Sequence, residues 1–394
     1  MQGKVTMPEA QSTEAPYSPG VWEIAFVQDC NLRCSYCCTG FGRFGRRATF
    51  MQPEVWRRLT DRMLEMSGKQ RDIHLSLATG ETFLHFDEAM GFLDHLRGLS
   101  TGQIDVEIIT NGTVATSEQL RTCLEKKISL CFSIDGPASR HDAFRKSSDR
   151  KPTQRIAMRN WRRYRAMVDA VANGTTCQVY SVIAGEGRLR DVARFWRKRG
   201  VMRFKAIPAE PNRHLGRVEL SEWETRRARY LEDLEALAFS EAKRLRGRKL
   251  AEEAAAPLGI LSSWRRLNDA SPYRSCGAGY STIGVDADGT LYPCQGFFGY
   301  AERSIGDIPS GVDAAKLAEF RSARTRAEAG CSACWARFLC DGGCCAADPN
   351  AGVVIDAWKQ CEFFKAHAEI AIQSHQSWCG YGTCAARPRE GVTG

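Results

Sequence analysis

The chain has 394 residues, of which 43% are hydrophobic and 26% are charged, with a formal net charge of +9 at pH 7. This length suits two domains with linkers, and the composition is that of a globular protein, not a disordered or fibrous one. No apolar run approaches the roughly 18–20 residues of a membrane span, and residues 1–20 lack the apolar stretch of a secretory signal. We therefore expect a cytoplasmic protein that does not bind a membrane.

From Val21 to about Pro208, short β-rich runs alternate with helical stretches. Pro53 suits the first turn of a helix, and Ser117 with Glu118 and Gln119 supplies a capping signal. Six strand–helix alternations predict parallel βαβ units, two fewer than a closed eight-fold barrel needs, so we expect an α/β fold with a partial (β/α)6 barrel. The expected strands are Trp22–Gln28, Ile73–Ala78, Asp105–Thr110, Ser129–Ile134, Thr176–Ile183 and Met202–Ile207, and the expected helices are Pro53–Ser67, Asp87–Leu99, Ser117–Lys126, Thr153–Val171 and Leu189–Arg199.

Two long helical segments follow at about Ser221–Arg246 and Leu250–Leu267. After Pro272 the sequence becomes rich in glycine and cysteine, and Asp286–Gly289 is a hairpin signal. The end of the chain, from about Gln373, is expected to be loose. The expected division is a disordered lead-in at 1–20, the barrel at 21–215, a helical linker at 216–272, a cysteine-rich domain at 273–365 and a tail at 366–394.

Much of the positive charge lies in two stretches, Arg155–Arg165 and Arg226–Lys249. Both have helical apolar spacing, as at Trp223, Tyr230, Leu234 and Leu237. A charged face on an amphipathic helix usually meets water, and an acidic peptide partner is the alternative. Since no zinc-finger or RNA-recognition pattern accompanies the charge, we do not expect nucleic acid as a partner.

The chain has 17 cysteines, and without a secretory signal these favour metal or cluster binding over disulfides. Cys30, Cys34 and Cys37 directly follow the first expected strand with the spacing C-x3-C-x2-C. One tight loop can thus present three thiolates to an iron–sulfur cluster, and three ligands on four irons leave one iron open for chemistry. A zinc site would be expected to use paired CxxC or Cys/His sets. Cys38 adjoins the three and is expected to pack rather than to bind the cluster.

In these residues the chain resembles the radical SAM superfamily, whose signature also has an aromatic residue before the third cysteine, here Tyr36. The resemblance implies a [4Fe-4S] cluster whose open iron chelates the amino and carboxylate groups of S-adenosyl-L-methionine (SAM). One electron then splits the sulfonium bond and releases a 5′-deoxyadenosyl radical, which abstracts a hydrogen atom from the substrate. No protein acid or base is assigned to this step, so the catalytic side chains are unknown.

Further polar groups follow the later strands, where catalytic groups of parallel barrels gather. Thr79-Gly80-Glu81-Thr82 stands where the superfamily usually carries Gly-Gly-Glu-Pro, and only the central Gly-Glu is kept. The resemblance implies that Glu81 accepts from the methionine ammonium and that Ser133 and Asp135 lie near the SAM ribose and methionine. An arginine can pair with a carboxylate through two hydrogen bonds, which makes Arg145 a candidate. The expected cofactor-binding positions are Tyr36, Gly80, Glu81, Asn111, Ser133, Asp135 and Arg145.

A second set of seven cysteines near the end exceeds what one structural zinc site needs. It resembles the SPASM domain, a cysteine-rich iron–sulfur domain with two auxiliary [4Fe-4S] clusters. The resemblance implies an outer cluster on Cys331, Cys334, Cys340 and Cys361, and an inner one on Cys276, Cys294 and Cys344. A fourth inner ligand is undetermined; Cys345, Cys379, Cys384 and a substrate thiolate are the candidates.

Auxiliary clusters imply that an electron leaves the substrate radical, which favours net oxidation over rearrangement. Cys-Gly-Ala-Gly, Leu-Tyr-Pro-Cys and Cys-Asp-Gly-Gly-Cys in the C-terminal segment look most like peptide maturases. We therefore expect an enzyme that forms oxidative cross-links in a ribosomally made peptide or protein. The alternative is a dehydrogenase or epimerase acting on a small molecule such as an aminoglycoside or sugar. A third class, a non-catalytic electron carrier, would not need SAM-binding positions.

The partners that follow are a precursor peptide or protein and a reductant such as flavodoxin or ferredoxin. Since only some twenty residues precede the first expected strand, leader binding calls for a separate protein or the basic helices.

Overall fold

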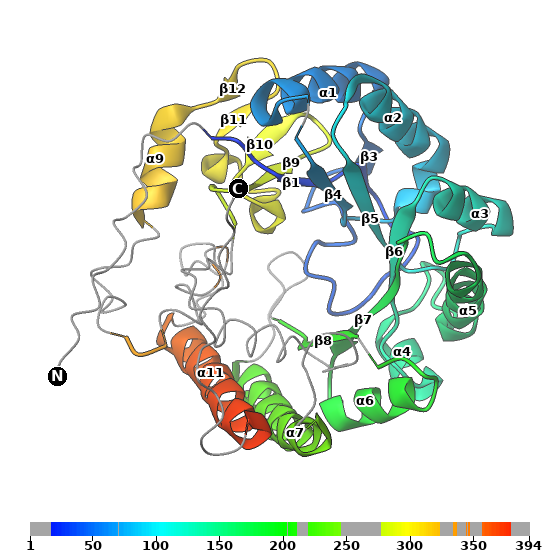
Figure 1. Ribbon diagram of the computed structural model, residues 1–394, viewed down its shortest axis with the longest axis vertical. Helices are drawn as coiled ribbons and strands as arrows, with labels where there is room; N and C mark the ends of the chain where they lie inside the picture. Colours follow the sequence, from blue (N-terminus) through cyan, green and yellow to red (C-terminus); the bar gives the residue numbers. More distant parts are fainter. Residues whose placement is uncertain are drawn as a thin grey trace, which may run out of the picture.

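A computed structural model describes residues 17–69, 71–202, 204–210, 220–245, 277–323, 334–336, 344, 346 and 357–379. Its main feature is one ten-stranded sheet with the strand order β12-β11-β10-β9-β1-β4-β5-β6-β7-β8. Figure 1 shows this sheet as an open arc, with helices along its outer side. A second, two-stranded sheet pairs β2 with β3.

Six of the ten strands are parallel neighbours from β1 to β8, and a helix follows each of them. The predicted α/β fold with a partial (β/α)6 barrel is thereby confirmed. The strands are β1 Val21–Ile24, β4 Ile73–Leu77, β5 Ile104–Thr110, β6 Ile128–Ser133, β7 Cys177–Ile183 and β8 Lys205–Pro208. The helices are α1 Pro53–Ser67, α2 Phe86–Leu99, α3 Ser117–Glu125, α5 Gln154–Val171, α6 Leu189–Arg197 and α7 Leu220–Leu245.

Alternating burial along β5 shows how the sequence directs the two faces of the sheet. Ile104, Val106 and Ile108 are buried and belong to the main core together with apolar side chains of the surrounding helices. Asp105 and Glu107 lie on the opposite face, because successive side chains of a strand point to opposite sides. The core therefore lies between the sheet and the helices, and the concave inner face is polar at this strand.

The first expected strand, Trp22–Gln28, is divided in the structure. β1 ends at Ile24, and after a break β2 Val27–Gln28 pairs antiparallel with β3 Thr49–Phe50. The change of partner separates the barrel strand from the segment that enters the cysteine loop. Three elements were not predicted in this half: the short helices η1 Thr82–His85 and α4 Ala138–Phe144, and the strand β3.

Helix α3 begins at Ser117, as expected, but its cap is the preceding residue and not Ser117 itself. Thr116 is the N-cap: its Oγ1 accepts from the backbone N–H of Gln119 at 3.2 Å, and Gln119 Oε1 accepts from the N–H of Thr116 at 3.0 Å. The hydroxyl of Ser117 instead accepts from Nη1 of Arg163 at 2.5 Å. The prediction of Ser117 as the cap was therefore wrong, since a neighbouring threonine has the same chemistry.

The C-terminal strands extend the barrel sheet directly. β9 Thr282–Val285 runs parallel to β1, and β10 Thr290–Tyr292 returns antiparallel to β9 through the predicted turn at Asp286–Gly289. Gly289 has φ +91°, a conformation that glycine adopts without strain. The remaining described elements are η3 Gln295–Phe297, η4 Ala301–Arg303, β11 Gly306–Asp307, β12 Gly311–Val312, α9 Ala314–Ala323 and α11 Ala357–Cys379.

Helix α11 corrects the expectation of a loose end from Gln373, because the helix continues to Cys379. It lies beside α7 (Figure 1), where the rings of Phe363 and Tyr230 are 6.0 Å apart. Trp223, Tyr230 and Leu234 of α7 are buried, as their spacing predicted. The second predicted helix of this region, Leu250–Leu267, lies outside the described residues. Within the described part of the chain, no helix combines the length and apolarity that a membrane crossing requires.

Candidate functional site

Cys30, Cys34 and Cys37 lie on the single loop that joins β2 to β3. The backbone N–H of Cys37 donates to the carbonyl of Cys34 at 3.1 Å, which closes a turn between the two. Two further backbone bonds hold the loop to the segment after β6: Arg33 N–H donates to Lys146 O at 2.7 Å, and Ser35 N–H to Phe144 O at 3.0 Å. The loop is thus fixed over the carboxyl ends of the parallel strands.

The thiols of Cys30 and Cys34 are held in a largely dehydrated environment. Cys30 Sγ accepts from the N–H of Leu32 at 3.4 Å, and Cys37 Sγ accepts from the N–H of Phe41 at 3.1 Å. Burial raises the pKa of Cys30 to about 12 and that of Cys34 to about 11. Buried thiols of this kind stay protonated until a metal displaces the proton, since only a cation makes the thiolate stable there. The three thiols therefore fit a cluster as a donor set.

No group of three or more His, Cys, Asp or Glu side chains in the described residues is arranged to hold a single metal ion. In a four-iron cluster each cysteine binds a different iron atom, so the thiols need not converge on one point. Cys38 was expected to pack and not to bind the cluster; its side chain is exposed to solvent.

Gly80 allows the end of β4 to approach the cysteine loop closely. It has φ +65°, and a Cβ atom there would lie 2.1 Å from the carbonyl oxygen of Val27 and 2.5 Å from that of Asp29. Distances this short exclude any side chain. On the other side, a Cβ on Gly42 would lie 2.5 Å from Gly80 Cα. The central glycine of the Thr79–Thr82 motif is therefore required by the backbone packing itself.

Glu81 is completely buried and connects the ends of β4 and β5. Its Oε1 accepts from Thr110 Oγ1 and its Oε2 from the N–H of Asn111, both at 2.7 Å. Burial raises the pKa of Glu81 to about 6, while these hydrogen bonds act in the opposite direction. The carboxylate thus orders the turn that carries Asn111. Any contact with a substrate ammonium would be additional to these bonds.

Asn111 reaches from the end of β5 to the first cysteine. Its Nδ2 donates to Asn31 Oδ1 at 2.9 Å and approaches Cys30 Sγ at 3.6 Å, and its Oδ1 accepts from the N–H of Thr113 at 2.9 Å. The Thr110–Thr113 motif therefore positions the cysteine loop through the Asn111 side chain.

Tyr36, Asp135 and Arg145 form a polar group on the other side of the loop. The Tyr36 hydroxyl donates to Asp135 Oδ2 and accepts from Arg145 Nη1 at 3.0 Å. Arg145 Nη1 also lies 3.9 Å from Asp135 Oδ1. Among the described residues, the buried Nε of Arg145 has no hydrogen-bond partner. Ser133 is the last residue of β6, two positions before Asp135, and its side chain is buried.

His141, to which the sequence assigned no role, contacts the backbone of Asp135 and the side chain of Thr153. His141 Nδ1 accepts from the N–H of Asp135 at 3.3 Å, so Nε2 carries the proton and donates to Thr153 Oγ1 at 3.1 Å. Thr153 in turn donates to the carbonyl of Arg145 at 2.6 Å. Burial lowers the pKa of His141 to about 3, which keeps the ring neutral. No spacing pattern signals this role, because it depends on the fold of the α4–α5 connection.

Asp29, the residue before Cys30, was also missed. Its Oδ1 accepts from the N–H of Cys30 at 2.9 Å and from Arg43 Nη2 at 2.7 Å. It thus joins the two ends of the cysteine loop.

The second cysteine set is only partly within the described residues. Cys294, Cys334, Cys344 and Cys361 are described, and Cys344 is exposed. Cys294 is the N-cap of η3, where the N–H of Gln295 donates to Glu23 Oε2 at 2.7 Å on β1. Cys361 lies on α11. Cys276, Cys331 and Cys340 lie outside the described residues, as do Cys345 and Cys384. The assignment to two clusters stays a prediction.

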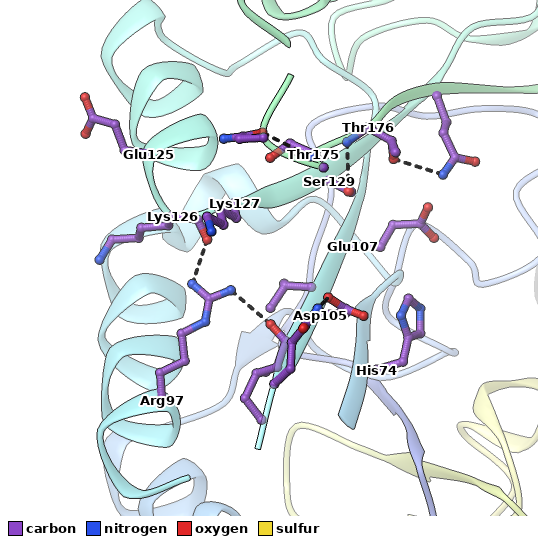
Figure 2. A pocket seen from close by; sticks show the side chains of 16 residues that line it. His74, Arg97, Asp105, Glu107, Glu125, Lys126, Lys127, Ser129, Thr175 and Thr176 are labelled. Carbon is purple, nitrogen blue, oxygen red and sulfur yellow. Dashed lines mark hydrogen bonds between the residues drawn. The ribbon is translucent and has the colours of Figure 1, made fainter. Parts of the chain in front are cut away.

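A cavity of about 740 Å³ lies at the amino ends of the strands, away from the cysteines. Figure 2 shows Asp105 and Glu107 of β5 on one side of it and Arg97 on the other. Arg97 donates to the carbonyls of Lys126 and Ile104, at 2.7 and 3.2 Å. The cysteine loop lies at the opposite ends of the same strands, so this cavity is separate from the candidate SAM site.

Comparisons with known proteins agree with this geometry. Residues 24–187 match the family model described as the radical SAM superfamily. The structure of native anSMEcpe with bound AdoMet and Cp18Cys peptide has a TM-score of 0.71 and 18% identity, over 91% of this chain and 98% of that one. Streptococcus suis SuiB bound to precursor peptide SuiA has a TM-score of 0.58 and 16% identity, over 84% of this chain and 72% of that one. No curated protein matches the chain in sequence.

Proposed function

We propose that this chain, whose residues 24–187 match the radical SAM superfamily model, uses a 5′-deoxyadenosyl radical for oxidative cross-link formation in a ribosomally made peptide or protein. The observation that carries the proposal is the single loop with Cys30, Cys34 and Cys37 at the carboxyl ends of the barrel strands. Catalytic groups of parallel barrels lie at these strand ends.

Cys30, Cys34 and Cys37 are the proposed ligands of a [4Fe-4S] cluster with one open iron. When bound, the cluster supplies the electron that divides SAM into methionine and the 5′-deoxyadenosyl radical. The protein's part is to hold the loop and the cofactor. Asn111 positions the loop beside Cys30, and Gly80 brings the end of β4 against it. The buried Nε of Arg145, which has no partner among the described residues, is available for the SAM carboxylate.

Tyr36 and Asp135 orient the Arg145 guanidinium, and His141 and Thr153 fix the backbone on which it stands. The five side chains thus form one support that reaches from the cysteine loop to the start of α5. Glu81 and Ser133 complete the proposed cofactor surface at the ends of β4 and β6. In this arrangement the protein binds and orients, and no side chain is proposed to transfer a proton.

The C-terminal cysteines extend the proposal to two auxiliary [4Fe-4S] clusters in a SPASM domain at about 273–365. Cys331, Cys334, Cys340 and Cys361 are the proposed outer ligands, and Cys276, Cys294 and Cys344 the inner ones. Such clusters would accept the electron that the substrate radical loses when a bond is closed. A reductant such as flavodoxin or ferredoxin would supply the electron for SAM cleavage.

Peptide as the substrate class is supported by two structures of the same fold, anSMEcpe with the Cp18Cys peptide and SuiB with the precursor peptide SuiA. The competing activity is that of a dehydrogenase or epimerase on a small molecule. Mass spectrometry of a candidate precursor co-expressed with the enzyme separates the two. Loss of two hydrogen atoms from the precursor supports the peptide reaction, and an unchanged mass beside an oxidised sugar contradicts it.

The radical reaction itself is tested by anaerobic reconstitution followed by SAM and dithionite. We expect 5′-deoxyadenosine from the wild type and none from the Cys30→Ala/Cys34→Ala/Cys37→Ala variant, which should also lose about four iron atoms per chain, the content of one cubane. Cys38→Ala is the matched control, because this thiol adjoins the others but is exposed. If the triple variant kept the iron content and the 5′-deoxyadenosine release of the wild type, the proposal would be contradicted.

A further inference from the structure

The outer face of α5 carries arginines that are not neutralised by the surrounding protein. Arg155, Arg159 and Arg162 are exposed, and their spacing of four and three residues places them on one side of the helix. None of the three has a carboxylate oxygen within 4.0 Å among the described residues. Farther along the helix, Arg165 is already paired with Asp169 at 2.8 Å.

Arginines on the neighbouring outer helices behave differently. Arg188 pairs with Asp233 at 2.7 Å, and Arg194 pairs with Asp191 at 3.3 Å. Arg229 pairs with Glu186. Many surface arginines thus have a carboxylate partner, whereas α5 places three exposed arginines without one, within the described part of the chain, on a single side of one helix.

A small cavity continues this charged face toward α6. It has a volume of about 300 Å³ and is lined by Trp161, Arg162, Arg165, Ala166, Asp169 and Arg199. The rings of Trp161 and Trp196 meet edge to face at 5.2 Å, which holds α5 against α6. This contact brings Arg199, just beyond the end of α6, to the same cavity as Arg162. Figure 1 shows both helices on the outer side of the sheet.

Arg199 is held in place before any ligand binds. Its guanidinium lies 3.6 Å from the centre of the Phe195 ring, and its Nη1 donates to the Phe195 carbonyl at 2.9 Å. Partial burial, and after it the nearby charge of Arg162, lower the pKa of Arg199. Two guanidinium groups that repel each other across a cavity are stabilised by an anion placed between them.

We propose that Arg155, Arg159, Arg162 and Arg199, here called the α5 basic face, dock an acidic segment of the peptide substrate through its Asp and Glu carboxylates. The proposal rests on the proposed function for the choice of a peptide. Carboxylates match the forked donors of arginine, which can form two parallel hydrogen bonds with each. The face lies outside the barrel, so it acts in substrate binding and not on the reacting atoms.

The aromatic residues of this region favour a peptide over nucleic acid. Trp161 is 4% exposed and Phe195 is 8% exposed; Phe195 lies beneath the Arg199 guanidinium, and Trp161 lines the cavity with Arg162 and Arg199. Proteins that bind single-stranded nucleic acid interleave their cations with exposed aromatic side chains on which bases stack. The described part of this face offers cations without such a stacking surface.

The test is the binding of a short fluorescein-labelled peptide of alternating glutamate and alanine to the full-length reconstituted enzyme, read by fluorescence anisotropy. Arg162→Glu/Arg199→Glu is expected to raise the Kd about tenfold, through two lost attractions and two new repulsions. The matched control is Arg58→Glu/Arg121→Glu, which makes the same charge change at exposed arginines of α1 and α3. We expect less than about a twofold change there. Far-UV circular dichroism checks that both variants are folded.

Three outcomes would overturn the proposal. The first is equal weakening in both double variants, which would indicate attraction by net charge alone. The second is binding of the glutamine version of the peptide as tightly as the glutamate version. The third is tighter, Arg162-dependent binding of an oligouridylate of the same length, which would assign the face to RNA.

Failure of docking and failure of the proposed function give different results. Peptide binding is measured without turnover, and release of 5′-deoxyadenosine from SAM alone is expected to be the same in the wild type and in Arg162→Glu/Arg199→Glu. If Arg162→Glu/Arg199→Glu binds the peptide as tightly as the wild type, the docking proposal is wrong and the proposed radical reaction is unaffected. If the wild type binds the peptide but releases no 5′-deoxyadenosine, the proposed radical reaction is wrong and the docking proposal is unaffected.

Discussion

Individual residues around the cysteine loop act mainly by allowing or fixing close approach. Gly80 is the sharpest case, because carbonyl oxygens of Val27 and Asp29 occupy the space that a side chain would need. Asn111 and Glu81 act through hydrogen bonds that tie the ends of neighbouring strands to the loop. Within the barrel, the loop therefore owes its position to contacts with residues about 50 to 110 positions later in the chain.

Replacing Gly80 by alanine is expected to destabilise the protein by roughly 2–4 kcal/mol, from backbone strain at positive φ and from overpacking. The measurement is the midpoint of urea unfolding. Gly91→Ala is the control, since this glycine lies inside α2 with open space around it. There we expect a gain of about 0.5–1 kcal/mol. A Gly80→Ala variant as stable as wild type would contradict the close approach.

At the scale of elements, two of the helices begin at residues whose local chemistry suits a helix N-terminus. α1 has Pro53 in its first turn, where the missing N–H costs nothing. α3 has a reciprocal capping box between Thr116 and Gln119. These signals are local, which is why most helix bounds agreed with the sequence pattern to within two residues.

Thr116→Ala is expected to cost about 1 kcal/mol, because it leaves the N–H of Gln119 without its acceptor. Ser117→Ala removes only the acceptor of the Arg163 side chain, so we expect a loss below about 0.5 kcal/mol. Thermal unfolding midpoints of the two variants, measured side by side, distinguish them. A lower unfolding midpoint for Ser117→Ala than for Thr116→Ala would indicate that Ser117 is the N-cap.

At the scale of the whole molecule, the barrel and the C-terminal hairpin are one sheet. β9 pairs with β1, and the fully buried Asp286 accepts from Gln28 and from Arg46 at the two ends of the cysteine loop. Phe44 of the loop packs edge-on against Phe298 with ring centres 5.7 Å apart. The C-terminal segment thus helps to hold the loop that carries the proposed cluster ligands.

Asp286→Ala is expected to cost roughly 2–3 kcal/mol, because the buried amide of Gln28 loses its acceptor. Hydrogen exchange followed by mass spectrometry should show lower protection in β9, in β1 and in the cysteine loop together. Asp288→Ala is the comparison on the same turn: it removes an exposed ion pair with Arg46 at 3.2 Å and an acceptor of the Thr290 N–H, so we expect a smaller loss. Lower protection confined to β9 and β10 would show that the hairpin does not support the loop.

Local patterns by themselves determined the repeated strand–helix units, the turn at Asp286–Gly289 and the loop with Cys30, Cys34 and Cys37, because neighbours in the chain decide each of these. Only the tertiary structure decided that β9 extends the sheet beside β1, that α11 continues to Cys379 against α7, and that His141 supports Arg145. Such contacts join residues far apart in sequence or depend on the path of a connection. Their stability comes from burial and hydrogen bonding at a meeting point that no spacing of residues specifies.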